Sequence, residues 1–145
     1  MHEGSCQCGS VRFTLDGPFV LMLCHCRICQ KIHGSAFAPF LHAEARHFDW
    51  VGGESELRFF DTSEHLRRAF CARCGAPMPI LDRELNHVAI PASASDMPVN
   101  TRPAAHLHTA SQAPWFVIGD NAPRYATVPD GSVAALLMQM IGGQQ

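Results

Sequence analysis

Seven cysteines, set in three short motifs, are the residues of this chain whose types and spacing could do chemistry. Two of the motifs are Cys6-Gln7-Cys8 and Cys71-Ala72-Arg73-Cys74, each followed by a glycine, Gly9 or Gly75. On an extended segment the first motif points both sulfurs to one side, and the second is typical of a zinc knuckle in which Gly75 adopts a positive φ. Each motif supplies half of a tetrahedron. The sequence therefore predicts a closed, structural zinc site made of Cys6, Cys8, Cys71 and Cys74.

The third motif, Cys24-His25-Cys26-Arg27-Ile28-Cys29, fuses a C-x-C with a C-x-x-C and predicts that Cys24, Cys26 and Cys29 converge on a second zinc. Because no eighth cysteine exists, the fourth position falls to water, substrate or another residue type, and three protein ligands with an open position are typical of catalytic zinc. Such a zinc could polarise a carbonyl or bind a substrate thiol as thiolate, and the negative charge of three thiolates favours the thiolate. Alternatively, a histidine or aspartate elsewhere closes the site, which would then be structural.

The bulk composition narrows the class of protein. The chain has 145 residues, of which 47% are hydrophobic and 17% charged, and we expect one zinc-binding domain over residues 1–145. A net charge of −2 gives no basic field for nucleic acid, and the longest apolar stretch is far shorter than the roughly 20 residues of a membrane span. The first residues lack the features of a secretory signal, so we expect a cytoplasmic protein whose cysteines bind metal instead of forming disulfides.

Many short segments with alternating polarity or β-branched and aromatic residues predict a mainly β fold, separated by glycine- and proline-containing turns. The predicted strands are Ser10–Leu15, Phe19–Cys24, Ala36–His42, His47–Val51, Leu57–Asp61, Leu66–Cys71, Pro77–Leu81, His87–Pro91, Ala105–Thr109 and Trp115–Ile118. One helix is predicted over Ser132–Ile141, with Ser132 as its cap, Asp130 just before it and Gly142-Gly143 at its end, and a short helical turn is possible at Arg27–His33. Metal cross-links that close long loops would stabilise so small a core.

Stretches around all three cysteine motifs carry a resemblance to a known family, in order from Gly4 to about Pro129. The quoted stretches are Gly4-Ser5-Cys6-Gln7-Cys8-Gly9-Ser10-Val11-Arg12-Phe13, the Cys24–Cys29 motif with Gly34-Ser35-Ala36-Phe37, Arg68-Ala69-Phe70-Cys71-Ala72-Arg73-Cys74-Gly75, Arg102-Pro103-Ala104-Ala105-His106 and Ser111-Gln112-Ala113-Pro114-Trp115. They resemble the glutathione-dependent formaldehyde-activating enzyme family, which includes centromere protein V. One stretch departs from the family pattern: Pro91–Pro98 keeps only Asp96 and Pro98 of a G-[ST]-L-D-D-P sequence.

The resemblance implies a β-tent of small antiparallel sheets around two zinc ions per chain, with a short C-terminal helix. It also implies the same division of the cysteines into a structural and a catalytic site. The implied activity joins a thiol such as glutathione to a small aldehyde such as formaldehyde, which is a carbon–sulfur lyase reaction in the reverse sense. The departure at Pro91–Pro98 concerns the substrate and leaves the metal ligands intact.

Two functions of different classes follow as hypotheses. In the first, the chain is an enzyme, and a histidine protonates the new alkoxide; His25, His33 and His106 are candidates, and His106 is preferred because it matches the family pattern. In the second, the chain is a zinc-containing thiol carrier or scavenger without true catalysis, since formaldehyde and thiols also combine unaided. A zinc-stabilised interaction module is disfavoured by the balanced charge and the missing basic tail.

Overall fold

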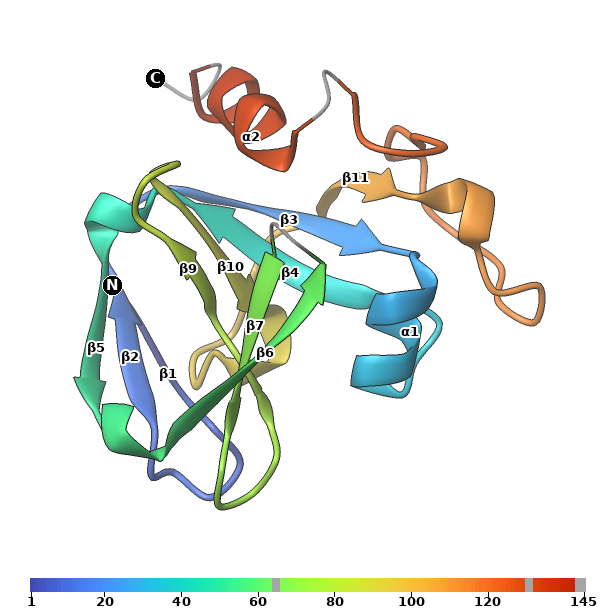
Figure 1. Ribbon diagram of the computed structural model, residues 1–145. Coiled ribbons are helices and arrows are strands. Elements are labelled where there is room, and N and C mark those ends of the chain that lie inside the picture. Colours follow the sequence, from blue (N-terminus) through green and yellow to red (C-terminus); the bar gives the residue numbers. More distant parts are fainter. Residues whose placement is uncertain (64–65, 130–131, 143–145) are drawn as a thin grey trace.

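The structure is a computed structural model that describes residues 1–63, 66–129 and 132–142, and it shows a mainly β protein with two helices (Figure 1). The helices are α1 (Arg27–His33) and α2 (Val133–Gly142). The strands are β1 (His2–Ser5), β2 (Arg12–Leu15), β3 (Phe19–Cys24), β4 (Ala38–Ala43), β5 (Phe48–Gly52), β6 (Leu57–Ser63), β7 (Leu66–Cys71), β8 (Pro77–Met78), β9 (Ile80–Asp82), β10 (His87–Pro91) and β11 (Pro103–Leu107).

The described strands form three small sheets with the orders β1-β2-β5, β11-β3-β4-β10-β9 and β6-β7-β8. Neighbouring strands are antiparallel except for β11 and β3, which run parallel. A mainly β fold of small antiparallel sheets with a short C-terminal helix is thus confirmed. Within the described residues, no helix is both long and apolar enough to cross a membrane.

The five-stranded sheet is covered on both faces, and the alternation along β3 shows how. Phe19 and Leu21 pack toward the core that the sheet shares with Phe13 and Phe48 of the β1-β2-β5 sheet. The alternate residue Met22 packs with Leu137 on the inner side of α2. Because strand side chains alternate between faces, Cys24 at the end of β3 belongs to the α2 side of the sheet.

Most of the predicted elements are present, and the N-terminus of α2 is capped as expected. The Oγ atom of Ser132 accepts a hydrogen bond from the backbone N–H of Ala135 at 3.0 Å. The helical turn at Arg27–His33 is present as α1, which ends at Gly34 in the left-handed conformation with φ 60°. Asp130 and Gly143, which were expected to flank the C-terminal helix, lie outside the described residues.

Two of the predicted extended segments are wrong, and one strand was missed. The Cys6–Cys8 motif is a turn, because the N–H of Gly9 donates to the carbonyl of Cys6 at 3.1 Å and reverses the chain there. Residues 115–118 are irregular: Trp115 and Val117 are 72% and 85% exposed and have no strand beside them to pair with. The missed strand is β1, whose short polar sequence shows no alternation but which pairs with β2.

Candidate metal centres

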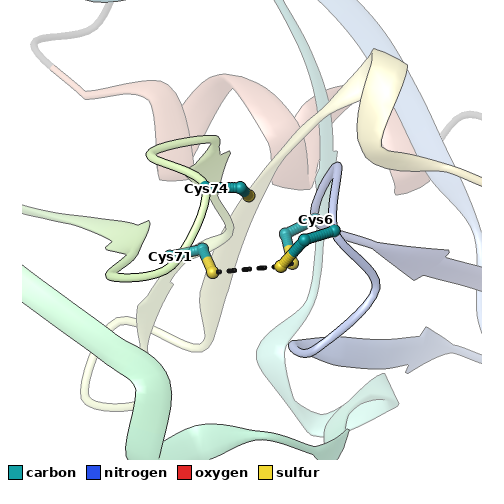
Figure 2. A group of neighbouring side chains, drawn as sticks. Cys6, Cys71 and Cys74 are labelled. Atoms are coloured by element: carbon teal, nitrogen blue, oxygen red, sulfur yellow. Dashed lines mark hydrogen bonds between the residues drawn. The ribbon is translucent and has the colours of Figure 1, made fainter.

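The first cysteine cluster joins a loop near the N-terminus to a loop in the middle of the chain. Cys6 follows β1, Cys71 ends β7 and Cys74 lies in the turn after it, and Figure 2 shows these side chains pointing toward one another from two facing loops. The four sulfurs of Cys6, Cys8, Cys71 and Cys74 all lie within 4.8 Å of one another. Two of the distances are 3.6 Å between the sulfurs of Cys6 and Cys8 and 3.9 Å between those of Cys8 and Cys71. This cluster could hold a metal ion.

Both turns of the first cluster depend on glycine in a left-handed conformation. Gly9 has φ 80° and Gly75 has φ 78°, a region that residues with a Cβ rarely adopt. In each turn the glycine N–H donates to the carbonyl of the first cysteine, at 3.1 Å for Cys6 and 2.8 Å for Cys71. The two turns are therefore alike in construction, and the positive φ predicted at Gly75 is confirmed.

The surroundings of the first cluster favour thiolate at Cys6 and Cys71, whereas burial raises the pKa of Cys74. Burial by itself raises the pKa of the Cys6 thiol, but hydrogen bonds from the backbone of Val11, from Ser10 and from the neighbouring cysteines lower that pKa to about 6. The Val11 N–H lies 3.3 Å from the Cys6 sulfur. The Ser10 hydroxyl lies 3.1 Å from the sulfur of Cys8 and 3.4 Å from that of Cys71. Donors that contact a ligating sulfur in this way support a metal-bound thiolate.

The second cluster is built where β3 passes into α1. Cys24 ends β3, Cys26 is the N-cap of α1 and Cys29 lies in the first turn of the helix. The sulfur of Cys26 accepts a hydrogen bond from the N–H of Cys29 at 3.3 Å, so the capping contact itself brings these two cysteines together. The sulfurs of Cys24, Cys26 and Cys29 lie within 4.8 Å of one another, and this cluster too could hold a metal ion.

The three thiols of the second cluster share their protons unequally. Hydrogen bonds with Cys24 and Cys29 lower the pKa of Cys26, whereas hydrogen bonds with Cys26 and Cys29 raise the pKa of Cys24. Among residues 1–63, 66–129 and 132–142, no histidine, aspartate or glutamate joins these three sulfurs within 4.8 Å. The alternative of a fourth protein ligand therefore finds no support within those ranges.

A cavity of about 420 Å³ opens directly onto the second cluster. Its walls include all three cysteines, Phe40 and His42 of β4, His87 of β10, His108 at the end of β11, Arg68 of β7 and the first residues of α2. A ligand atom bound at the second cluster therefore has room for the rest of its molecule. The first cluster also borders a cavity, of about 410 Å³ at Cys6, but its four sulfurs would fill a tetrahedral metal ion and leave no ligand position open.

Arg68 is a buried cation beside the second cluster. It is 6% exposed, and its Nη2 atom donates to the sulfur of Cys29 at 3.2 Å. Its Nε atom is buried and has no hydrogen-bond partner among the described residues. A guanidinium is always charged near neutral pH, so Arg68 offsets part of the negative charge that three thiolates would carry.

The predicted proton donor, His106, is buried at 2% exposure, and other side chains engage both of its ring nitrogens. Its Nδ1 atom lies 2.8 Å from Nε2 of His25, and its Nε2 atom lies 3.0 Å from each carboxylate oxygen of Asp120. His106 does not line the cavity, whereas His108, two residues later, does. The two are not alternate residues of one strand, because β11 ends at Leu107 and His108 adopts φ 56°.

His25 connects this buried chain of side chains to the second cluster. It stands between Cys24 and Cys26 and is fully buried, and its backbone carbonyl accepts a hydrogen bond from Gln30 of α1 at 2.8 Å. Burial is the main cause that lowers its pKa. Asp120, His106 and His25 therefore form one hydrogen-bonded row that ends inside the cysteine motif.

Besides the interior pair of His25 and His106, a histidine pair lines the cavity wall, and sequence reasoning missed it. The Nδ1 atom of His42 and the Nε2 atom of His87 lie 2.9 Å apart, with their rings nearly parallel. Burial lowers the pKa of His42 to about 3 and also lowers that of His87. Both imidazoles are therefore neutral near pH 7. Phe40 and His42 are two residues apart on a predicted strand, so the sequence indicated that they share a face. The partner of His42 is His87, which lies 45 residues away and could not be inferred locally.

Small β sheets that hold one cluster of four cysteines and one of three define a β-tent protein with two candidate metal centres. The model of the glutathione-dependent formaldehyde-activating enzyme family matches residues 1–111. The chain therefore belongs to that family, as the sequence motifs predicted.

A curated relative supports this assignment, and a solved structure matches the fold. A protein of Halomonas elongata, itself named only provisionally as a glutathione-dependent formaldehyde-activating enzyme, is 32% identical over 146 aligned positions, which cover 91% of each chain. The crystal structure of a Rhodobacter sphaeroides protein matches with a TM-score of 0.56 at 18% identity, covering 68% of this chain and 91% of that one. At so low an identity the second match concerns the fold alone.

Proposed function

We propose that the protein is a zinc enzyme of the carbon–sulfur lyase class, which joins a thiol to a small aldehyde and catalyses the reverse cleavage. The observation that carries this proposal is the cavity of about 420 Å³ that meets three converging cysteines and, within the described residues, no fourth protein ligand. Membership of a glutathione-dependent formaldehyde-activating family supports the choice of reactants. The seven free cysteines suit a reducing compartment, and we place the protein in the cytoplasm.

The cysteine geometry fits zinc. Four thiolates at about 2.3 Å from a tetrahedral zinc lie about 3.8 Å from one another, which agrees with the 3.6 and 3.9 Å in the first cluster. We assign one structural zinc to Cys6, Cys8, Cys71 and Cys74 and a second zinc to Cys24, Cys26 and Cys29. Zinc bound at the second cluster would hold a substrate sulfur as its thiolate.

The chain's own residues then provide charge balance and a proton. Arg68 offsets the negative charge beside Cys29, and apolar side chains form much of the cavity wall around the cluster. The carbon–sulfur bond forms as the carbonyl π bond breaks, and the alkoxide oxygen receives a proton. His108 is the best-placed donor for that proton because it lines the cavity on the cysteine side.

The role predicted for His106 stays a prediction, and its position supports a different contribution. The Nδ1 atom of His106 contacts His25 and so holds the segment between Cys24 and Cys26, while its Nε2 atom contacts Asp120. His108, by contrast, adopts a left-handed backbone conformation that costs about 1 kcal/mol or more for a residue with a side chain. Such strain at a cavity wall favours a functional over a merely structural histidine.

Initial rates separate catalysis from simple thiol binding. Hemithioacetal formation from glutathione and formaldehyde is measured with catalytic amounts of the zinc-loaded wild type and of Cys26→Ser. Serine is a good N-cap residue, so this variant keeps α1 while removing one thiolate. The wild type should exceed the spontaneous rate and the variant should not. A wild type that only accumulates product stoichiometrically, at the spontaneous rate, would contradict catalysis and support the thiol-carrier hypothesis.

A further inference from the structure

The cavity at the second cluster is lined by few charged residues for a site that would bind glutathione. Half of the described residues that line it are aliphatic or aromatic, and only Arg68 and Asp82 carry a full charge. Glutathione brings two carboxylates and one ammonium, and burying such groups without partners is costly. The lining is thus better matched to a molecule with little charge.

Few groups on the wall could pair with the two carboxylates of glutathione. The guanidinium of Arg68 is 6% exposed and donates to the sulfur of Cys29, which leaves its buried Nε N–H as an unpaired donor. His42 and His87 share a hydrogen bond and are neutral near pH 7, because burial lowers the pKa of each. His108 is the other basic side chain on the described part of the wall.

Two apolar parts of the cavity wall come from different segments, one inside the family-matched residues 1–111 and one beyond them. Leu85, in the turn between β9 and β10, is 64% exposed yet lines the cavity. Val133 and Ala134 at the start of α2 also line it, and they lie beyond residue 111, where the family match ends. The C-terminal helix therefore adds an apolar surface to the cavity that the matched family region does not supply.

We propose that the second cluster takes an apolar, uncharged thiol in preference to glutathione, with the sulfur at the cysteines and the body against Leu85 and Ala134. This inference rests on the proposed function and specifies its substrate class. Burying apolar surface in such a cavity is favourable in proportion to the area removed from water. The aldehyde and the bond changes remain those given above.

Thiol binding to the cobalt-substituted protein tests the proposal, because the visible spectrum of cobalt reports a new sulfur ligand without requiring turnover. The probes are benzyl mercaptan and glutathione, titrated into the same fully loaded protein. We expect benzyl mercaptan to bind at least tenfold more tightly. Equal binding, or tighter binding of glutathione, would overturn the apolar preference while leaving the proposed function standing. If neither thiol changes the spectrum, both proposals fail.

Substitutions in the cavity wall test whether Leu85 and Ala134 cause the preference for an apolar thiol. Leu85→Lys and Ala134→Asp place a charge on the apolar surface and should each reduce the affinity for benzyl mercaptan at least fivefold without loss of cobalt. Met138→Lys is the matched control, since Met138 lies on the same helix, is 54% exposed and does not line the cavity. A loss of affinity in the control equal to that in the two wall variants would contradict the assignment of this surface.

Discussion

The Nη2 atom of Arg68 lies 3.2 Å from the sulfur of Cys29, and through this contact β7 touches both cysteine clusters. Cys71 of the first cluster stands three residues further along the same strand. Because an odd separation places two strand residues on opposite faces, Arg68 points to the second cluster while Cys71 points to the first. One strand thus separates the two candidate metal centres and fixes their relative position.

The two clusters should differ sharply in what their loss does to the fold. Cys71→Ser opens the link between the N-terminal loop and the middle of the chain, and should cost about 4 kcal/mol or more of unfolding free energy. Cys26→Ser should retain the fold and lose one of two zinc ions. Metal analysis and thermal unfolding of both purified variants check this. A fully loaded, reduced wild type with a single zinc would contradict the two-site assignment.

Removing the cation beside the second cluster should weaken metal binding there. Arg68→Met is expected to lower zinc affinity at the second cluster by about 10- to 100-fold, the usual effect of losing a group that hydrogen-bonds a metal ligand. Arg67→Met is the matched control, because Arg67 is exposed and pairs with Asp61 of the neighbouring strand β6 instead of a cysteine. Competition with a chelator measures the affinity. Equal affinities of the two variants would argue against charge compensation by Arg68.

The hydrogen-bonded row of Asp120, His106 and His25 should affect metal binding at the second cluster by holding its cysteines in position. Asp120→Ala leaves a buried imidazole nitrogen unpaired and should reduce metal affinity at that cluster by about tenfold. Asp120→Asn retains an oxygen that can accept from His106 and should restore most of the affinity. Chelator competition again provides the readout, and the absence of any difference between alanine and asparagine would exclude the hydrogen bond as the cause.

His108 and His106 should respond differently to the same substitution. His108→Gln removes the candidate proton donor from the cavity wall and should lower kcat by about 100-fold with the metal content unchanged. His106→Gln should instead lower metal retention, because it disturbs the row that holds His25. Parallel kinetics and metal analysis distinguish these outcomes. A kcat loss in His106→Gln at full metal content would restore His106 as the proton donor.

The buried His42 should make stability depend on pH. Its pKa falls to about 3 in the folded chain, below the usual value near 6.5, so the unfolded state binds more protons between those limits. Stability therefore rises with pH through this window and is lost on acidification, with a slope of up to about 1.4 kcal/mol per pH unit for one proton. His42→Gln should flatten the slope. Denaturant unfolding of both proteins at pH 4.5 to 7 measures it, and identical slopes would contradict this assignment.

The sequence by itself predicted both cysteine clusters, because each C-x-C or C-x-x-C brings its own sulfurs together and two matching half-sites indicated that Cys6 and Cys8 meet Cys71 and Cys74. It also predicted the glycine turn at Gly75 and most of the strands, whose alternation reflects the two faces of a sheet. The strand expected at Trp115–Ile118 failed because apolar content alone does not provide a neighbouring strand to pair with.

Only the tertiary structure decided which side chains surround the second cluster. Arg68 and Cys29 are 39 residues apart, and His25 and His106 are 81 residues apart, so no local pattern could have joined them. The fold also separated two neighbouring histidines, since a left-handed turn at His108 leaves His106 in the interior and His108 on the cavity wall. Motif spacing fixes ligands that are close in sequence, whereas charge balance, proton donors and cavity walls come from strands that meet only after folding.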